Sequence, residues 1–445
     1  MGRLWRILPP AMLIALVAWP APAAEQNKAE RAEFRIAQRQ LRNPDEMQRV
    51  EGIQRLSTMP GPEAAKLIVP AGLIDAAPAV RHAAYRTLRA WKDDPQVGEF
   101  LLGVLKRESR AKKKGPSCTV PLLMILLNSE SADTRGDVTK FVDAFAANPD
   151  NIPFLIDAAD ELGKLADDFS LLPLRRMTAL KCFASIFGFR RAVVQAMILV
   201  RRPKAMEALI DLLPKTDGEV RGDIRRHLFA VAGQIAGDDD RAWSLWWQKH
   251  KDDFRFPPPG DEPLSTEAVP GTPSYYGLSI HAKRIVFVVD VSGSMRGPRL
   301  EAAQRELTQT IDKLPEATSL SLVAFSDRTV VWRKTLARAT PQTKQAARRF
   351  VYQLRAGGRT AAYDALEAAF RFDAEAFYFL SDGAPNAGTI RRPDAILTAV
   401  AQTNRVRRIS IYTIGILPGE PGGPLDLFMK TLAEEDFGVY RRVEK

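Results

Sequence analysis

Two apolar runs of the sequence each end in an acid, and hydroxyl side chains follow the first of them. The first run is Ile285 to Val289, and it is followed by Asp290, Ser292 and Ser294, so that the three polar residues stand at alternate positions. The second run ends in Asp382. In a sheet of parallel strands, ligands bind outside the carboxyl ends of the strands. Both carboxylates are therefore expected at one rim of a sheet.

A glycine-rich segment lies between the two runs and supplies a further hydroxyl group. Its sequence is Ala356-Gly357-Gly358-Arg359-Thr360, and it leads into a segment with helical periodicity. The two glycines allow the backbone to approach other groups closely, and they would present Thr360 at the start of the helix.

Together these segments provide two carboxylates and three hydroxyls, which is a donor set suited to a hard divalent cation. Mg²⁺ prefers oxygen ligands in octahedral geometry and usually keeps several waters. A site with few carboxylates leaves the ion electrophilic and with an open coordination position. We expect an acidic group of a partner protein to fill that position.

The elements around these residues alternate between strands and helices, as in a doubly wound α/β sheet. Apolar strand patterns occupy 285–289, 320–325, 330–332, 377–380 and 409–414, and a last strand is expected within 438–443. Helical patterns occupy 300–314, 343–354, 363–372, 393–405 and 425–432. The sequence predicts that the site lies on this C-terminal domain, residues 282–445.

These residues resemble the metal-ion-dependent adhesion site of the von Willebrand factor type A domain. That pattern is Asp-x-Ser-x-Ser, then a Thr, then an Asp, and here it is met by Asp290, Ser292, Ser294, Thr360 and Asp382. The resemblance implies that the serines and the threonine bind Mg²⁺ or Mn²⁺ directly, and that the aspartates bind it directly or through water. It also implies a protein-binding module with no catalysis of its own.

Two other readings of the same residues stay open. In the first, the metal only ties strand ends together, and the protein is a scaffold of the cell envelope whose helical half binds partners. In the second, the protein is a hydrolase, which the residues disfavour. Ser292 stands where an Asp-nucleophile phosphohydrolase needs a second acid, and none of the four histidines lies at the predicted rim. We therefore predict that the protein is not an enzyme.

Residues 25–252 have helical periodicity and few strand signals. Apolar residues share one face in 78–92 and again in 218–233, and each of these stretches follows another apolar helical segment, 64–74 and 205–213. Paired helices of this kind resemble HEAT repeats, although an irregular helical domain explains the pattern nearly as well. Three tryptophans, Trp243, Trp246 and Trp247, share one helical face near the end of this region and are expected in a core or a domain seam.

A proline-rich segment, residues 253–281, is predicted to link the two domains. Residues 1–24 have a positive start, a short apolar stretch and small residues before Glu25, which is the pattern of a cleaved export signal. An uncleaved anchor is the competing interpretation. The mature chain is then periplasmic or extracellular, and no transmembrane span is expected in it.

Charge and cysteine content add weaker expectations. The 445 residues carry a formal net charge of +11, which favours acidic partners or anionic surfaces. The basic run 106–114 is either an anionic docking patch or a solvated helix end, and since it lacks interleaved aromatic residues no nucleic-acid partner is expected. Cys118 and Cys182 could pair outside the cytoplasm or stay as buried free thiols.

Overall fold

The computed structural model describes residues 23–110, 117–232, 239–258, 272–417 and 419–444. The described residues form two compact units. One unit is drawn from the ranges 1–103 and 113–118, and the other from 104–112 and 119–445. The predicted export signal lies outside the described residues, apart from its last two. No helix of the described ranges combines the length and apolar character needed to cross a membrane.

The first unit consists of helices whose apolar faces pack on one another. Proline occupies the first position of α3 and of α4, where its missing N–H costs nothing, and Asp45 caps α2 by accepting the N–H of Met47. The predicted helical segments 64–74 and 78–92 correspond to α3 and α4. The helices are α1 Ala23–Gln40, α2 Glu46–Ser57, α3 Pro62–Gly72, α4 Pro78–Ala90 and α5 Pro95–Glu108.

The second unit begins with further helices, the last of which buries Trp243, Trp246 and Trp247 as expected. The predicted segments 205–213 and 218–233 correspond to α12 and α13. The helices are α6 Thr119–Leu126, α7 Ala132–Ala146, η1 Pro149–Asn151, α8 Ile152–Leu165, α9 Leu171–Met177, α10 Lys181–Ser185, α11 Phe187–Val200, α12 Pro203–Leu212, η2 Leu213–Lys215, α13 Gly218–Ala232 and α14 Asp240–His250.

A seven-stranded sheet forms the centre of the rest of this unit, with the strand order β5-β4-β3-β7-β8-β9 and with β6 paired to β4. The strands β4, β3, β7, β8 and β9 are parallel, whereas β5 and β6 run antiparallel to β4. The strands are β3 Arg284–Asp290, β4 Ser319–Phe325, β5 Thr329–Val331, β6 Ala337–Arg338, β7 Ala376–Ser381, β8 Ser410–Ile416 and β9 Tyr440–Val443. A separate hairpin pairs β1 Ser274–Tyr275 with β2 Leu278–Ser279.

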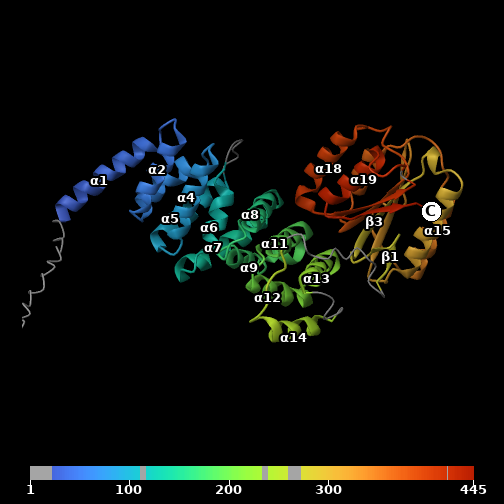
Figure 1. Cartoon of the computed structure of the whole chain (residues 1–445), viewed down its shortest axis with the longest axis horizontal. Helices are drawn as coiled ribbons and strands as arrows, with labels where there is room; N and C mark the ends of the chain where they lie inside the picture. Colours follow the sequence, from blue (N-terminus) through green and yellow to red (C-terminus); the bar gives the residue numbers. More distant parts are fainter. Residues whose placement is uncertain (1–22, 111–116, 233–238, 259–271, 418, 445) are drawn as a thin grey trace, which may run out of the picture. The chain divides into compact units, whose positions relative to one another are not determined.

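Helices cover both faces of this sheet, so that the predicted three-layer α/β fold is confirmed (Figure 1). Its central strands are continuous apolar runs because both of their faces are buried. One core packs the sheet against α15 and α16, and the other packs it against α17, α18 and α19. The remaining elements are η3 Gly293–Met295, α15 Pro298–Lys313, α16 Pro341–Gln353, α17 Ala362–Ala369, α18 Pro393–Arg407 and α19 Pro424–Glu435.

A buried polar network joins the helices of the second unit to the amino ends of β7 and β8. The Glu219 carboxylate, at the start of α13, accepts the Tyr412 hydroxyl at 2.6 Å and the Arg226 guanidinium at 2.9 Å. The Glu219 N–H in turn donates to the carboxylate of Glu375 at 3.0 Å. Arg191 of α11 is fully buried and donates to the backbone carbonyl of Arg408 at 2.6 Å. This junction lies at the end of the sheet opposite to the carboxyl rim.

The predicted linker, the basic run and the two cysteines can be compared with the structure in the residues that it describes. The range 253–281, predicted as a linker, contains the β1–β2 hairpin, whose Tyr275 packs edge-on against Phe287 of β3. The basic run 106–114 begins within the last turns of α5, and its residues 111–114 lie outside the described part. Cys118 and Cys182 are both buried and do not form a disulfide with each other.

Candidate metal centre

The register of the sheet brings the two predicted carboxylates to the same rim. Strands β3 and β7 are parallel neighbours, and Val289 pairs with Leu380. Asp290 and Ser381 are the last residues of these strands, and Asp382 follows immediately. The strands end together, so the carboxylates of Asp290 and Asp382 lie at one edge, as the sequence predicts.

Asp290 is held by hydrogen bonds inside the protein and is completely buried. One carboxylate oxygen accepts the Ser381 hydroxyl at 2.5 Å, and the other accepts the Ser292 N–H at 2.7 Å. Burial raises the pKa of Asp290 to about 6, although the hydrogen bonds from Ser381 and Ser292 act in the opposite direction. No ion pair to Asp290 exists within the described ranges. A bound cation would supply the missing positive charge.

Ser292, Ser294 and Asp382 form a chain of hydrogen-bonded oxygens. The Ser292 and Ser294 hydroxyl oxygens are 3.0 Å apart, and the Ser294 hydroxyl donates to Asp382 at 2.7 Å. The alternation seen in the sequence has a structural cause. The chain leaves β3 at Asp290 and turns into the short 3₁₀ helix η3. The two hydroxyls come to lie beside each other, and that of Ser294 reaches Asp382.

The glycine-rich segment is fastened to the same rim through its backbone. The Gly357 N–H donates to the carbonyl of Val291 at 2.9 Å, and the carbonyl of Gly358 accepts the Gly293 N–H at 3.0 Å. Gly358 has a φ of +78°, and a Cβ there would collide with the carboxylate of Asp327. The positive φ therefore favours glycine at this position.

Thr360 is buried and fixed in place by Asn386. The Thr360 N–H donates to the Asn386 side chain at 2.9 Å, and the Thr360 carbonyl accepts the Asn386 N–H at 3.0 Å. A methyl group placed on Gly383 would lie 3.4 Å from the Thr360 hydroxyl and 3.6 Å from that of Ser294. Both hydroxyls thus border Gly383, and the structure brings all five predicted residues together.

The gathered side chains fit a hard divalent cation by their chemistry. Oxygens supply the whole donor set, and one carboxylate is buried without a cation beside it. Within the described ranges, no group of three or more His, Cys, Asp or Glu side chains could hold a metal ion. That finding is compatible with the predicted set, because three of its five members are hydroxyl residues.

Three residues contribute to this site without having been identified as site residues from the sequence. Ser381 holds Asp290, Asn386 holds Thr360, and Arg299 of α15 donates to Asp382 at 2.7 Å. Ser381 could have been found, since it directly precedes Asp382 at the end of an apolar run. Arg299 and Asn386 carry no such signal, because their contacts depend on how the loops fold.

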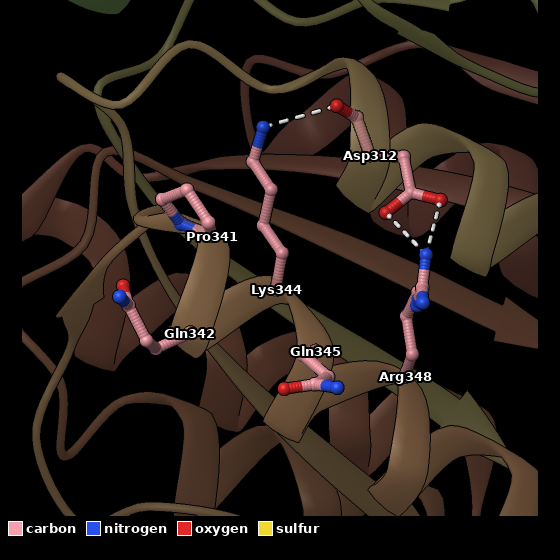
Figure 2. A pocket seen from close by; sticks show the side chains of 6 residues that line it. All are labelled: Asp312, Pro341, Gln342, Lys344, Gln345 and Arg348. Carbon is pink, nitrogen blue, oxygen red and sulfur yellow. Dashed lines mark hydrogen bonds and ion pairs between the residues drawn. The ribbon is translucent and has the colours of Figure 1, made fainter.

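A hollow elsewhere on the domain is a poorer candidate for function. It has a volume of about 500 Å³ and lies between the end of α15 and the start of α16 (Figure 2). Lys344 donates to the backbone carbonyl of Asp312 at 3.0 Å, and Arg348 pairs with the Asp312 carboxylate at 3.2 Å. The charged groups of the hollow therefore contact one another, and apart from Pro341 its lining lacks the apolar and aromatic side chains of most small-molecule sites.

The histidines also lie in other surroundings. His227 contacts Phe256, and His250 stacks on Trp246. The side chain of His281 lies beside Gly222 of α13. These contacts place the three histidines beside residues of the helical region and not beside the serines of the rim.

Comparison with known proteins finds similar sequences for the C-terminal region. Residues 283–441 match the family model of the von Willebrand factor type A domain. The inter-alpha-trypsin inhibitor heavy chain H3 of Mesocricetus auratus is 30% identical over 181 residues, which cover 38% of this chain and 20% of that protein. The human H3 heavy chain is 29% identical over 182 residues and has the same coverage. The chain thus spans about a fifth of the length of these relatives.

Solved structures of other proteins also match part of this chain. The von Willebrand factor type A protein from Catenulispora acidiphila has 24% identity and a TM-score of 0.32, over 38% of this chain and 40% of that chain. BatB from Bacteroides thetaiotaomicron has 17% identity and a TM-score of 0.29, over 36% of this chain and 90% of that chain.

Proposed function

We propose that this protein is an exported, non-enzymatic binding protein whose C-terminal domain holds Mg²⁺ at the rim and, through the metal, an acidic group of a partner protein. Mn²⁺ would serve in the same position. The observation that carries the proposal is the convergence of Asp290, Ser292, Ser294, Thr360 and Asp382 at one sheet rim. The similarity to von Willebrand factor type A domains supports a role in protein interaction.

The five residues would contribute two kinds of oxygen to the bound ion. Ser292, Ser294 and Thr360 offer neutral hydroxyl oxygens, and Asp290 and Asp382 offer the negative charge, either directly or through water. Only two carboxylates balance the ion, so the metal stays electrophilic and attracts a further carboxylate. When bound, the ion supplies an open coordination position for the partner.

A pull-down from cell-envelope extract tests this function. The full mature chain is used with Mg²⁺, with EDTA, and as the variant Asp290→Ala. Asp312→Ala is a suitable control, because it also removes an aspartate but lies in α15 beside the hollow of Figure 2. We expect one partner to be retained by the parent and by the control with Mg²⁺, and to be lost in the other two samples.

An alternative function would give a different result. If the metal only ties strand ends together and the helical region binds the partner, the partner is retained in every sample. EDTA then only lowers the melting temperature. Turnover of a phosphoester or peptide that is lost in Asp290→Asn would instead establish an enzyme and overturn the proposal.

Export is part of the same proposal and has its own test. The sequence pattern of residues 1–24 is its basis. The chain recovered from the periplasm or medium should begin after Ala23 or Ala24, which intact mass measurement determines. Recovery of the full-length chain in the membrane fraction would indicate a retained anchor.

A further inference from the structure

Arg299 occupies a position that the five predicted residues do not account for. It is the second residue of α15, and its guanidinium donates to the carboxylate of Asp382 at 2.7 Å. The same nitrogen lies 3.3 Å from the carbonyl oxygen of Ser294. The Asp382 side chain is fully buried, whereas the Arg299 side chain is 36% exposed. The positively charged guanidinium of Arg299, which is partly exposed to solvent, therefore neutralises Asp382, one of the two acids of the site.

The two carboxylates differ sharply in this respect. Asp382 has Arg299 as an ion-pair partner, but Asp290 has none among the described residues. The oxygen of Asp382 that contacts Arg299 is not the one that accepts the Ser294 hydroxyl. The guanidinium thus takes the remaining oxygen of Asp382 that could face an incoming ion or its bound water.

We propose that Arg299 competes with the divalent cation for Asp382 and thereby sets the metal affinity of the site. The proposal rests on the metal-binding function given above. Without metal, Arg299 compensates the buried charge of Asp382. When the metal binds, the guanidinium gives up part or all of this contact and remains at the rim as a nearby like charge. Both effects weaken metal binding relative to a site without the arginine.

The size of the effect follows from the exposure of Arg299. Partly exposed ion pairs contribute little, because solvent screens them, and a charge-assisted hydrogen bond to a buried carboxylate contributes more. We expect removal of the guanidinium to tighten Mg²⁺ binding by about three- to tenfold.

Isothermal titration of the full mature chain with MgCl₂, and separately with MnCl₂, tests the proposal. The variants are Arg299→Gln, Arg299→Lys and the control Arg296→Gln. Arg296 is exposed, lies three residues before Arg299 at the end of η3, and makes no ion pair among the described residues. The expected order of affinity is Arg299→Gln tightest, and Arg299→Lys between it and the parent. Arg296→Gln should lie near the parent, and far-ultraviolet circular dichroism checks that each variant is folded.

Other outcomes overturn the proposal in distinguishable ways. If Arg299→Gln binds the metal no more tightly than Arg296→Gln, Arg299 contributes only general surface charge. If both Arg299 variants are folded and bind more weakly than the parent, Arg299 positions Asp382 for the metal instead of competing with it. If the parent and every variant fail to bind metal, the proposed function fails as well.

Discussion

Thr360 allows the proposed metal-binding role of a hydroxyl to be separated from its structural role. The contacts described for Thr360 are made by its backbone, which exchanges hydrogen bonds with Asn386. Thr360→Val keeps the shape of the side chain but removes the oxygen, whereas Thr360→Ser keeps the oxygen. We expect the valine variant to lose at least tenfold in Mg²⁺ affinity by titration calorimetry, about 1.4 kcal/mol, and the serine variant to stay close to the parent. Equal affinities would exclude Thr360 as a ligand.

The two cysteines give a prediction about chemical reactivity. Both are buried and are not bonded to each other, and burial raises the pKa of Cys182 to about 11. The thiolate of Cys182 is therefore scarce at neutral pH, and burial shields both thiols from reagents. We expect an aromatic disulfide reagent at pH 8 to label neither thiol quickly in the folded protein and to label two per chain in guanidinium chloride. Fewer than two after unfolding without reductant would mean that the thiols pair in solution.

The residues of the site were predictable to the extent that their signal is local. An acidic residue at the end of an apolar strand is predicted to lie at the rim of the sheet. Asp290 and Asp382 both occupy such a position. Asn386 and Arg299 could not be predicted, because their partners lie 26 and 83 residues away in the chain. Only the packing of the loops and of α15 determines those contacts.

At the scale of the elements, helices α11 and α18 pack closely together where α11 has Gly188. A Cβ on Gly188 would collide with the backbone carbonyl of Val406, which cannot move aside as a flexible side chain can. We expect Gly188→Ala to lower the stability by about 2 kcal/mol, as overpacking does. Thermal unfolding followed by circular dichroism measures the change.

Gly136→Ala is the matched control for this substitution. Gly136 lies within α7, is exposed, and has nothing within 4 Å of the position that a Cβ would take. Alanine restricts the unfolded chain and favours the helix, so this variant should gain about 0.5 to 1 kcal/mol. If Gly136→Ala is destabilised and Gly188→Ala is unchanged, Gly188 does not lie in close contact with the Val406 carbonyl.

The major elements were predictable, whereas the shortest ones were not. Every predicted strand and helix of the C-terminal region exists, because long apolar runs and helical periodicity specify them locally. The two-residue strands β1, β2 and β6 were missed. Strands this short have no pattern of their own, and they form because the edge of a neighbouring element offers backbone partners.

For the whole molecule, the buried Glu219 predicts how the second unit responds to acid. Burial disfavours its charge, but Arg226 and Arg191 outweigh this effect and lower the pKa of Glu219 to about 2. The stabilisation is fully present above the ordinary pKa of 4.5 and is lost as the pH falls toward 2. We expect Glu219→Gln to melt several degrees below the parent at pH 7, and this difference to shrink between pH 4.5 and 2. Glu207→Gln, at an exposed position of α12, should match the parent throughout. A difference that stays constant across this range would show that Glu219 is not charged in the folded protein.

The same junction predicts how far the chain can be shortened. A piece comprising residues 273–445 keeps the whole sheet but loses Glu219, Arg191 and Asp160. Tyr412, the Arg408 carbonyl and the Arg408 guanidinium would then lose partners that they now contact. Buried polar groups left without partners are costly, so this piece should melt at a lower temperature than residues 119–445 in differential scanning fluorimetry.

The proposed metal site should be affected far less by this truncation. The junction lies at the amino ends of β7 and β8, whereas Asp290 and Asp382 lie at the opposite rim. If the shorter piece is measured well below its melting temperature, its Mg²⁺ affinity should equal that of residues 119–445. Equal melting temperatures would mean that the junction adds little to the stability of the sheet. A lower affinity at equal folding would instead show that the helices act on the rim through the length of the strands, which would make the helical region a regulator of metal binding.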